Sequence, residues 1–529
     1  MDTIRENGKI IKQDKEKTEN SSNGNGVGIN RKRKELVQEL QKVTTKQRHL
    51  TKTKEKDQDN IIYTPESDSK PDPKGVGHYY YTQLMKHQNE IAQIDGYTKE
   101  EDTFGSLLQR SVRTALTMLD KGIKPGDHVS LCTYHHFNSA VPHIASCFTG
   151  AIMGAIDPAL SLGDCVYLLK QTLPKIIFVN PSSVTLVEKI VESIGTKTEI
   201  VVFGKTTQHT PFSKYLRSHK DEKTFKPREV KNLNDIALIV FSSGSTGMPT
   251  GVCHSHLSIL YYTNERPVRY KQVLYAVLNP YWSLFALFLQ LSIEFGNPRI
   301  IYPVFDVNDA WTMYYQHVDL AFISSIFILQ MIRSKRPEKA NLKHVKTLNY
   351  GGSSLTLKQL NEIKLALPYT KTNYNYGQSE VFTGIFAFQP TATGMELLNK
   401  NPCSVGTVVK GVHYKIVDIE TEKNLGPNQI GELRIKTSSQ CVGYFKRDPA
   451  ECFDSDGWLK TGDLFYYNED LCFYAVDRIK ESFKYLNHHI SPVEIEKIIL
   501  DLEPVEAAVI MGKPHETDCN LPMAVVKLK

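Results

Sequence analysis

Serine, threonine and glycine are concentrated in one short segment, residues 242–251, which reads SSGSTGMPTG. Glycine lets the backbone approach an anion closely, and consecutive N–H groups with serine and threonine hydroxyls can surround phosphate oxygens. The apolar run Ile236–Phe241 before the segment predicts a buried strand, and the apolar stretch Leu257–Tyr262 after it predicts a helix. Because α/β folds bind nucleotides at loops between a strand and a helix, the segment predicts a phosphate-binding loop.

The surroundings of this segment distinguish it from two other kinds of loop. A flexible Ser/Gly linker has the same composition, but linkers are not normally held between two apolar elements. The segment is not a GxxxxGKS/T loop, because no lysine followed by serine or threonine comes after the glycines. We expect Thr246 to act in catalysis as well as binding. The candidate phosphate ligands are Ser242, Ser243, Gly244, Ser245, Thr246 and Gly247.

Three later motifs combine glycine with residues that can contact a nucleotide. Tyr350–Leu355 reads YGGSSL, Asn375–Glu380 reads NYGQSE, and Gly457–Leu464 reads GWLKTGDL. A carboxylate is a good acceptor for a diol such as ribose, and a hard cation that bridges phosphates prefers a carboxylate oxygen. In isolation, however, TGD is also an ordinary turn, and Glu380 is also an ordinary surface carboxylate.

The order of these motifs is that of a known superfamily. The chain resembles the adenylate-forming (AMP-binding) superfamily, which joins acyl-CoA synthetases, peptide-synthetase adenylation domains and firefly luciferase. The resemblance runs from about Tyr80 to Lys529. Gly431-Glu432-Leu433 and Gly443-Tyr444 stand at the expected places upstream of Gly457–Leu464. Within this superfamily, the sequence most resembles the branch of acyl-CoA synthetases and firefly-luciferase-like proteins.

The resemblance implies roles for several residues of a nucleotide site. Tyr376 would stack on or flank the adenine, Ser379 would touch a phosphate, and Glu380 would help to hold Mg²⁺. Asp463 would bind both ribose hydroxyls. The other residues that the resemblance places against the nucleotide are Gly351, Gly352, Ser353, Asn375 and Gly377.

The segment Asp477–Tyr485 (DRIKESFKY) resembles the family's hinge, where a small C-terminal lobe swings between two catalytic poses. By resemblance, Arg478 reaches the ribose, Lys480 lies at the pivot, and Lys484 acts in the thioester-forming pose. The family carries a further lysine beyond a strand similar to LPMAVV. We therefore expect residues 478–529 to form an incomplete C-terminal cap lobe.

Two other positions depart from the family pattern. Thr250 stands where the phosphate loop usually has a lysine, which removes one positive charge beside the phosphates. In the stretch that lines the family's acyl pocket, Ser283 replaces a usual histidine, while Trp282 and Phe285 keep an apolar wall. Bulky apolar side chains of this kind suit a hydrophobic acid as the substrate.

The composition excludes several classes of protein. Much of the net charge of +6 lies in the first 58 residues, so a nucleic-acid partner is not expected. The nine cysteines form no CxxC pair and predict neither a zinc ribbon nor a disulfide framework. The stretch Tyr281–Phe295 is too short to span a bilayer and predicts a buried core helix. Without a secretory signal or an SKL-type address, we expect an intracellular protein, cytoplasmic or peroxisomal by resemblance.

The elements that position the motifs follow from the apolar periodicity. Phe104–Lys121 has helical spacing, and short apolar runs alternate with such stretches, which predicts an α/β body of parallel sheets covered by helices. Short strands and turns after about Val405 predict a small β-rich region, followed by a helix at Pro492–Leu500 in a small α+β lobe. The predicted parts are a disordered basic tail over residues 1–75, an AMP-binding domain over 76–477 and the cap lobe over 478–529.

The function implied by the resemblance is an AMP-forming acid–CoA ligase. Such an enzyme activates a hydrophobic carboxylic acid with ATP and Mg²⁺ to an acyl-adenylate and then transfers the acyl group to CoA. Two alternatives are open. The first is a catalytically degenerate relative that binds nucleotide or acyl-CoA without turnover, as Thr250 and Ser283 suggest. The second is a luciferase-like oxygenase. The sequence gives no oligomeric state.

Overall fold

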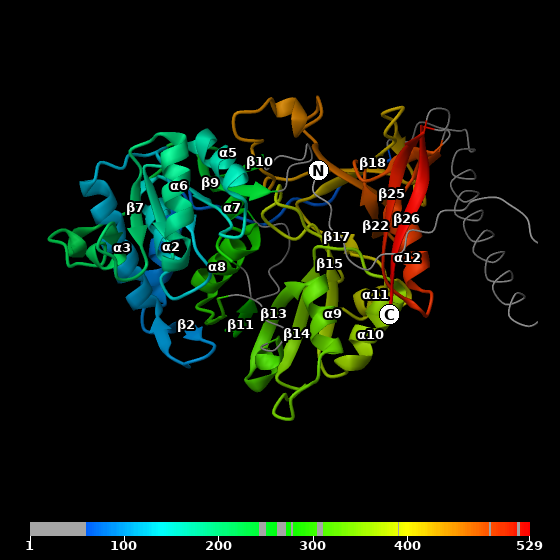
Figure 1. Cartoon of the computed structure of the whole chain (residues 1–529), viewed down its shortest axis with the longest axis horizontal. Coiled ribbons are helices and arrows are strands. Elements are labelled where there is room, and N and C mark those ends of the chain that lie inside the picture. The colour runs from blue at the N-terminus through cyan, green and yellow to red at the C-terminus, as the bar shows by residue number, and fades with distance from the viewer. Residues whose placement is uncertain are drawn as a thin grey trace, which may run out of the picture. The chain divides into compact units, whose positions relative to one another are not determined.

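The computed structural model describes residues 60–242, 250–261, 271–276, 279–303, 310–389, 391–485, 488–515 and 519–529. In these ranges the strands form four sheets, and the helices lie beside them (Figure 1). None of the described helices is both long enough and apolar enough to cross a bilayer. The α-helices are α2 Val76–Lys86, α3 Phe104–Asp120, α4 Val141–Thr149, α5 Leu162–Thr172, α6 Val184–Ile194, α7 His256–Leu260, α8 Ser283–Phe295, α9 Ser325–Arg333, α10 Leu357–Ala366, α11 Ala392–Lys400 and α12 Pro492–Leu500.

The first sheet has the order β10-β9-β5-β4-β6-β7-β8 and is parallel except for the pair β9–β10. Its inner strands are continuous apolar runs, as expected for parallel strands that are covered on both faces. Its strands are β4 His128–Cys132, β5 Ile152–Ala155, β6 Ile176–Val179, β7 Glu199–Val202, β8 Thr210–Pro211, β9 Ile236–Ser242 and β10 Thr250–Ser255.

The second sheet has the order β15-β14-β13-β11-β12-β2-β3 and is parallel except for the pair β2–β3. Figure 1 shows β13, β14 and β15 side by side in green. Its strands are β2 Ile91–Asp95, β3 Glu101–Thr103, β11 Leu274–Ala276, β12 Arg299–Ile301, β13 Val318–Ser324, β14 Val345–Gly351 and β15 Lys371–Asn375. The two sheets confirm the predicted α/β body.

The third sheet is antiparallel and has the order β1-β18-β20-β21-β22-β17-β16, with β19 paired to β18. It is the β-rich region predicted after Val405. Its strands are β1 Ile61–Ile62, β16 Phe386–Ala387, β17 Gly406–Val408, β18 His413–Val417, β19 Asn424–Leu425, β20 Gly431–Lys436, β21 Leu459–Tyr467 and β22 Cys472–Arg478.

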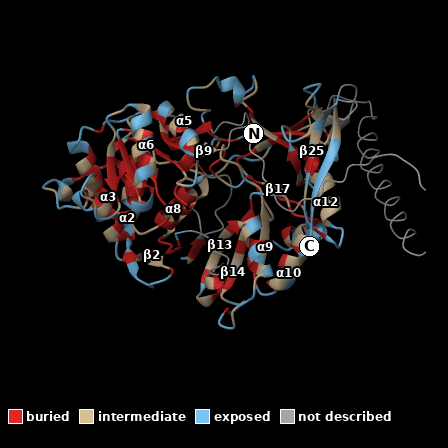
Figure 2. Cartoon of the chain, viewed as in Figure 1, coloured by how far each residue is buried: buried red, intermediate tan, exposed pale blue. Residues whose placement is uncertain are grey.

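The fourth sheet, β24-β23-β26-β25, is antiparallel and lies close to the end of the chain with α12. It begins just after Arg478, near the predicted boundary between the main domain and the cap lobe. Figure 2 shows that much of the hairpin β25–β26 is exposed, in contrast to the buried strands of the first two sheets. Its strands are β23 Phe483–Tyr485, β24 His488–Ile490, β25 Val505–His515 and β26 Cys519–Leu528.

Two sequence expectations need correction. Residues 60–75 were placed in a disordered tail, but Ile61 and Ile62 pair with Lys415 and Tyr414 of β18 as strand β1. These two isoleucines complete the edge of an apolar sheet, a gain that composition alone does not reveal. The remainder of the predicted tail lies outside the described residues. The second correction concerns the phosphate loop and follows below.

Candidate functional site

The predicted phosphate loop joins two antiparallel strands and not a strand and a helix. Ser242, the last residue of β9, pairs with Thr250, the first residue of β10, and helix α7 begins only at His256. The prediction of a strand-to-helix loop is therefore wrong. Strand β10 thus separates the loop from the N-terminus of α7, so that helix end does not follow the loop directly. The predicted ligands Ser243, Gly244, Ser245, Thr246 and Gly247 lie outside the described residues.

Strand β10 forms because both of its edges find a backbone partner. On one edge it pairs with β9, and on the other it bonds to residues 442–445. The amide of Cys253 donates to the carbonyl of Gly443 at 3.0 Å, and the amide of Phe445 donates to the carbonyl of Gly251 at 2.7 Å. A segment almost two hundred residues away thus holds residues 250–255 as a strand, between the predicted loop and the predicted helix.

The same segment also fixes Glu380. The amide of Cys441 donates to the carbonyl of Glu380 at 2.7 Å, and the Tyr444 hydroxyl donates to Glu380 Oε1 at 3.0 Å. From β10, a ring nitrogen of His254 lies 2.7 Å from the carbonyl oxygen of Ser379. The structure therefore brings three segments together: strand β10 after the predicted phosphate loop, the NYGQSE motif, and Gly443-Tyr444.

The electrostatics of Glu380 depend on burial and on Tyr444. Burial raises the pKa of the Glu380 carboxyl, while the hydrogen bond from Tyr444 acts in the opposite direction. The pKa of Tyr444 is raised well above its usual range, chiefly by burial and by the Glu380 charge. The tyrosine is consequently the proton donor of the pair, and the carboxylate is the acceptor.

The effect of pH provides a test of this pair. A protonated carboxyl binds a cation poorly, so an activity that uses a cation at Glu380 is expected above the raised pKa and is expected to be lost as the pH falls through it. Because Tyr444 lowers the pKa of Glu380, Tyr444→Phe is expected to move the acid limb of the pH–rate profile to higher pH. Tyr369→Phe on the surface serves as the control and should leave the limb in place. An unmoved limb in the Tyr444 variant would contradict the assignment.

Gly351 and Asn375 meet at the carboxyl ends of two neighbouring parallel strands. They are register partners at the ends of β14 and β15, where open α/β sheets bind ligands. A Cβ on Gly351 would collide with the carbonyl oxygen of Asn375. Gly352, which follows, has φ of +96°, and the carbonyl of Ser353 accepts a hydrogen bond from the Tyr374 hydroxyl at 3.3 Å. The first glycine thus allows close strand approach, and the second allows the turn.

Gly351→Ala is expected to destabilise the protein by about 1–3 kcal/mol, because the collision is with backbone that cannot rotate away. Gly377→Ala is a matched control, since a Cβ there meets no atom within 4 Å. Urea unfolding of both variants measures the free energy of unfolding. Equal free energies of unfolding for the two variants would contradict the prediction, because the ends of β14 and β15 would then move apart at no cost in stability.

Tyr376, Asp463 and Arg478 form one group, joined by a hydrogen bond and an ion pair. The Tyr376 hydroxyl donates to Asp463 Oδ2 at 2.5 Å, and Arg478 Nε lies 3.5 Å from Asp463 Oδ1. The Tyr376 ring packs edge-on against Phe465, with centroids 4.8 Å apart. Asp463 and Arg478 are also cross-strand partners in β21 and β22. The sequence named all three as nucleotide contacts but gave no sign that they contact one another.

Burial and these contacts set the charge of Asp463. Burial raises the pKa of its carboxyl, and the Tyr376 hydroxyl and the Arg478 guanidinium both work against that rise. Arg478 itself keeps 59% of its side chain exposed. The group therefore combines a largely buried acceptor with a cation that solvent and ligands can reach.

The TGD part of the GWLKTGDL motif is a β-bulge. Glu432 and Arg434 of β20 are two positions apart, but their partners Leu464 and Lys460 of β21 are four apart. Gly462, inside the bulge, has φ of +70°, which glycine adopts without strain. Bulges often re-aim a side chain beside an active site. Here the bulge carries Asp463.

The predicted pocket residues lie at the start of α8. Trp282 precedes the helix and is 38% exposed, Ser283 is its first residue, and Phe285 is only 2% exposed. The Phe285 ring packs edge-on against His135, with centroids 5.3 Å apart. Residues 281–295 thus include the expected buried helix, while the assignment of these three residues to an acyl pocket stays a prediction. The backbone of Lys484 pairs with His489 in the fourth sheet.

Comparison with known proteins agrees with this fold and motif order. The sequence profile of the family described as AMP-binding enzyme matches residues 80–445. The chain is 26% identical to luciferin 4-monooxygenase of Photuris pensylvanica over 494 residues, covering 88% of each protein. It is also 26% identical to 4-coumarate–CoA ligase 2 of Petroselinum crispum over 466 residues, covering 85% of this chain and 84% of that protein.

Solved structures give the same result. The luciferase-like enzyme from the nonluminescent mealworm Zophobas morio superimposes with a TM-score of 0.74 at 32% identity, covering 80% of this chain and all of that one. ATP-bound MatB from Rhodopseudomonas palustris shares the fold, with a TM-score of 0.73 at 20% identity over 86% of this chain and 89% of that one. The chain therefore belongs to the AMP-binding enzymes, the adenylate-forming superfamily that includes luciferases and acyl-CoA ligases.

Proposed function

We propose that this protein activates a hydrophobic carboxylic acid with ATP and then transfers the acyl group to CoA. The observation that supports this best is the convergence of Tyr376, Glu380, Asp463 and Arg478, whose charges act on one another. The matching family is that of AMP-binding enzymes, and the relatives of this chain include 4-coumarate–CoA ligases, whose name includes CoA. Asp463 would bind the ribose hydroxyls, and Arg478 would approach the same sugar.

The first half-reaction needs position and charge more than covalent participation by the protein. A carboxylate oxygen of the acid attacks the α-phosphorus, an O–P bond forms, and the bond to the β-phosphate oxygen breaks, releasing pyrophosphate. The partly buried carboxylate of Glu380 fits the Mg²⁺ that accompanies ATP, because a hard cation prefers oxygen ligands and would stabilise the ionised form of a carboxyl whose pKa is raised. The hydroxyls and N–H groups of the loop after Ser242 would contact the phosphates.

The second half-reaction replaces oxygen by sulfur at the acyl carbonyl. The CoA thiolate attacks the carbonyl carbon, a C–S bond forms, and the C–O bond to AMP breaks, so that AMP leaves with the electron pair. Lys484 of β23 is the residue that we assign to this step, from its place in the DRIKESFKY segment. Trp282 and Phe285 supply apolar surface near the start of α8 for the acid.

Pyrophosphate release tests the proposal. The purified chain is incubated with ATP, Mg²⁺ and a panel of aliphatic and aromatic acids, and release is expected only when an accepted acid is present. Formation of the acyl-CoA is then followed after CoA is added. If none of the acids leads to release of pyrophosphate, the proposed reaction is contradicted.

Thr250 favours a second candidate, a relative that binds nucleotide without turnover. Its side chain is uncharged and buried at the first position of β10, where the family's lysine would place a positive charge beside the phosphates. Losing one such electrostatic contact typically lowers the rate by about 10²–10³-fold. Calorimetric titration with ATP separates the candidates, because binding without pyrophosphate release supports the second one.

A further inference from the structure

Glu432, on strand β20, contacts the bulge that carries Asp463. Its Oε1 accepts a hydrogen bond from the backbone amide of Gly462 at 3.1 Å. Its Oε2 accepts one from Arg434 Nε at 2.8 Å. One carboxylate therefore joins the amide of the residue before Asp463 to a buried guanidinium.

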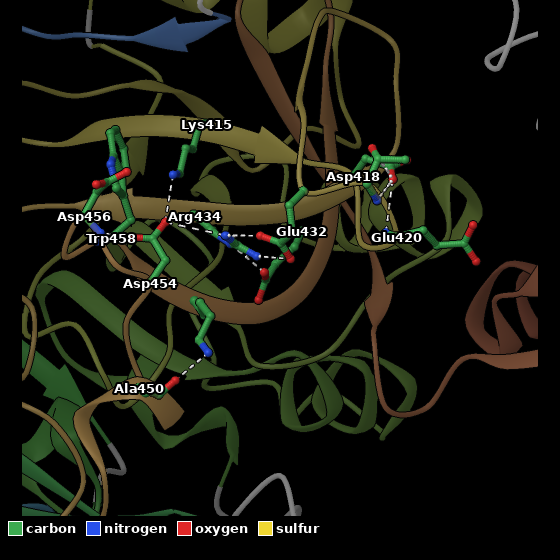
Figure 3. Close-up of polar contacts among 12 residues, drawn as sticks. Lys415, Asp418, Glu420, Glu432, Arg434, Ala450, Asp454, Asp456 and Trp458 are labelled. Atoms are coloured by element: carbon green, nitrogen blue, oxygen red, sulfur yellow. Dashed lines mark hydrogen bonds and ion pairs between the residues drawn. The ribbon is translucent and has the colours of Figure 1, made fainter.

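Arg434 extends this connection to the beginning of the same motif. Its Nη1 lies 3.5 Å from Asp454 Oδ2, and Asp454 Oδ1 accepts hydrogen bonds from the backbone amides of Asp456 at 3.0 Å and Trp458 at 2.9 Å. Figure 3 shows Arg434 between the two carboxylates, with Lys415 approaching the same oxygen of Asp454. Arg434 thus bridges two acids that each bind backbone N–H groups, one near the start of GWLKTGDL and one at its TGD bulge.

The charges of this group are well paired. Lys415 Nζ lies 2.8 Å from Asp454 Oδ2, and Arg434 also forms a two-pronged contact with Glu422 at 2.7 and 2.9 Å. The Arg434 side chain is only 7% exposed, whereas that of Glu422 is 63% exposed. Burial works against the charge on Arg434, but the hydrogen bonds that it donates to Glu422 and Glu432 leave its pKa above the usual range.

General stabilisation does not explain this arrangement well. A buried ion pair is often no more stable than apolar residues of similar size, because removing charges from water offsets their attraction. Such groups are better suited to fixing one geometry. In this sheet, the geometry in question is that of a bulge, which lacks the regular ladder of hydrogen bonds and needs other partners.

We infer that Glu432 and Arg434 are positioning residues for Asp463, holding the TGD bulge so that the carboxylate is preset for the two ribose hydroxyls of ATP. Thr461 acts with them, since its hydroxyl donates to the carbonyl of Leu433 at 2.6 Å and accepts from the amide of Asp463 at 3.2 Å. This inference rests on the proposed nucleotide-binding role of Asp463. It assigns the recognition of ribose to a group of residues that includes buried side chains without contact to the sugar.

The test compares ATP with 2′,3′-dideoxy-ATP, which lacks both hydroxyls. In Glu432→Gln the side chain keeps one oxygen acceptor and gains an amide donor, so it cannot accept from both Gly462 and Arg434. Arg434 keeps Glu422 and Asp454, so its charge stays paired. We expect the variant's affinity for ATP to fall about tenfold, with little change for the dideoxy analogue. Calorimetric titration with each nucleotide gives both values.

Glu422→Gln is the matched control, because it removes the same charge from the same arginine but does not touch Gly462. It should leave the preference for ATP over the dideoxy analogue unchanged. Glu432→Asp is a second variant that keeps the charge but is too short to reach both partners, and it should also lose the preference. Thermal unfolding confirms that each variant is folded.

The outcomes separate the inference from the proposed function. Wild-type protein that binds both nucleotides equally would contradict the role of Asp463 itself. Wild-type protein that prefers ATP, together with Glu432 variants that prefer it equally, would overturn the positioning role alone. An equal loss of affinity for both nucleotides in the Glu432 variants would also overturn it, since that is the result of general destabilisation.

Discussion

Asp463→Ala is expected to lower kcat/KM for ATP by about a hundredfold. The carboxylate would accept hydrogen bonds from both ribose hydroxyls, and hydrogen bonds to a charged group contribute about 1.5–3 kcal/mol each, or roughly tenfold or more in affinity. The substitution also leaves the buried Tyr376 hydroxyl without its acceptor and Arg478 without its anion. Initial rates of pyrophosphate release at varied ATP measure the loss.

Two companions distinguish ribose binding from local damage at Asp463. Asp463→Asn keeps an oxygen acceptor for Tyr376 but removes the charge. This variant should therefore fold normally, and its kcat/KM for ATP should still fall by most of the amount expected for Asp463→Ala. Asp470→Ala removes an acid that pairs with Lys400 on the surface after β21, and it should have near wild-type kinetics. A wild-type kcat/KM in the Asn variant would show that the charge on Asp463 is not used.

Glu380→Gln is expected to lower kcat by about 10²–10³-fold, the typical effect of removing one preorganised electrostatic contact from a reacting phosphate. The amide keeps the size of the side chain and an oxygen for the Tyr444 hydroxyl, so the hydrogen bond that positions the group survives. Only the negative charge toward Mg²⁺ is lost. The rate of pyrophosphate release is measured over a range of Mg²⁺ concentrations.

The dependence on Mg²⁺ is the specific readout for Glu380. The variant should need more Mg²⁺ for half-maximal rate, whereas Glu396→Gln, which changes an exposed carboxylate on α11, should not. A Glu380 variant with reduced kcat but an unchanged Mg²⁺ requirement would assign the carboxylate to another task.

Much of the fold could be predicted because local patterns agree with the tertiary structure. The run Ile176–Val179 is β6 with the same bounds, since a parallel strand covered on both faces is apolar throughout. The helix Pro492–Leu500 begins where Ser491 accepts from the amide of Glu494 and proline occupies the first turn. The residues Gly351 and Asn375 are likewise brought together by ordinary parallel pairing.

The parts that could not be predicted depend on partners distant in the sequence. Strand β10 exists because residues 442–445 complete its free edge, and nothing within Thr250–Ser255 encodes that contact. Tyr376 and Asp463 are 87 residues apart, so their hydrogen bond is visible only after two sheets are in place. The sequence assigns Glu432 no role beyond its place in the ordered motifs, whereas in the structure its carboxylate contacts the bulge directly.

The bulge in β21 contains an even number of additional residues, and this parity matters for the whole strand. Leu459 and Phe465, on either side of it, are both buried in the core of the third sheet. With two additional residues, the alternation of side chains continues in the same phase before and after the bulge. The TGD turn therefore interrupts β21 without reversing its inner and outer faces. The sheet core on either side of the motif therefore holds the two ends of the bulge, independently of any ligand.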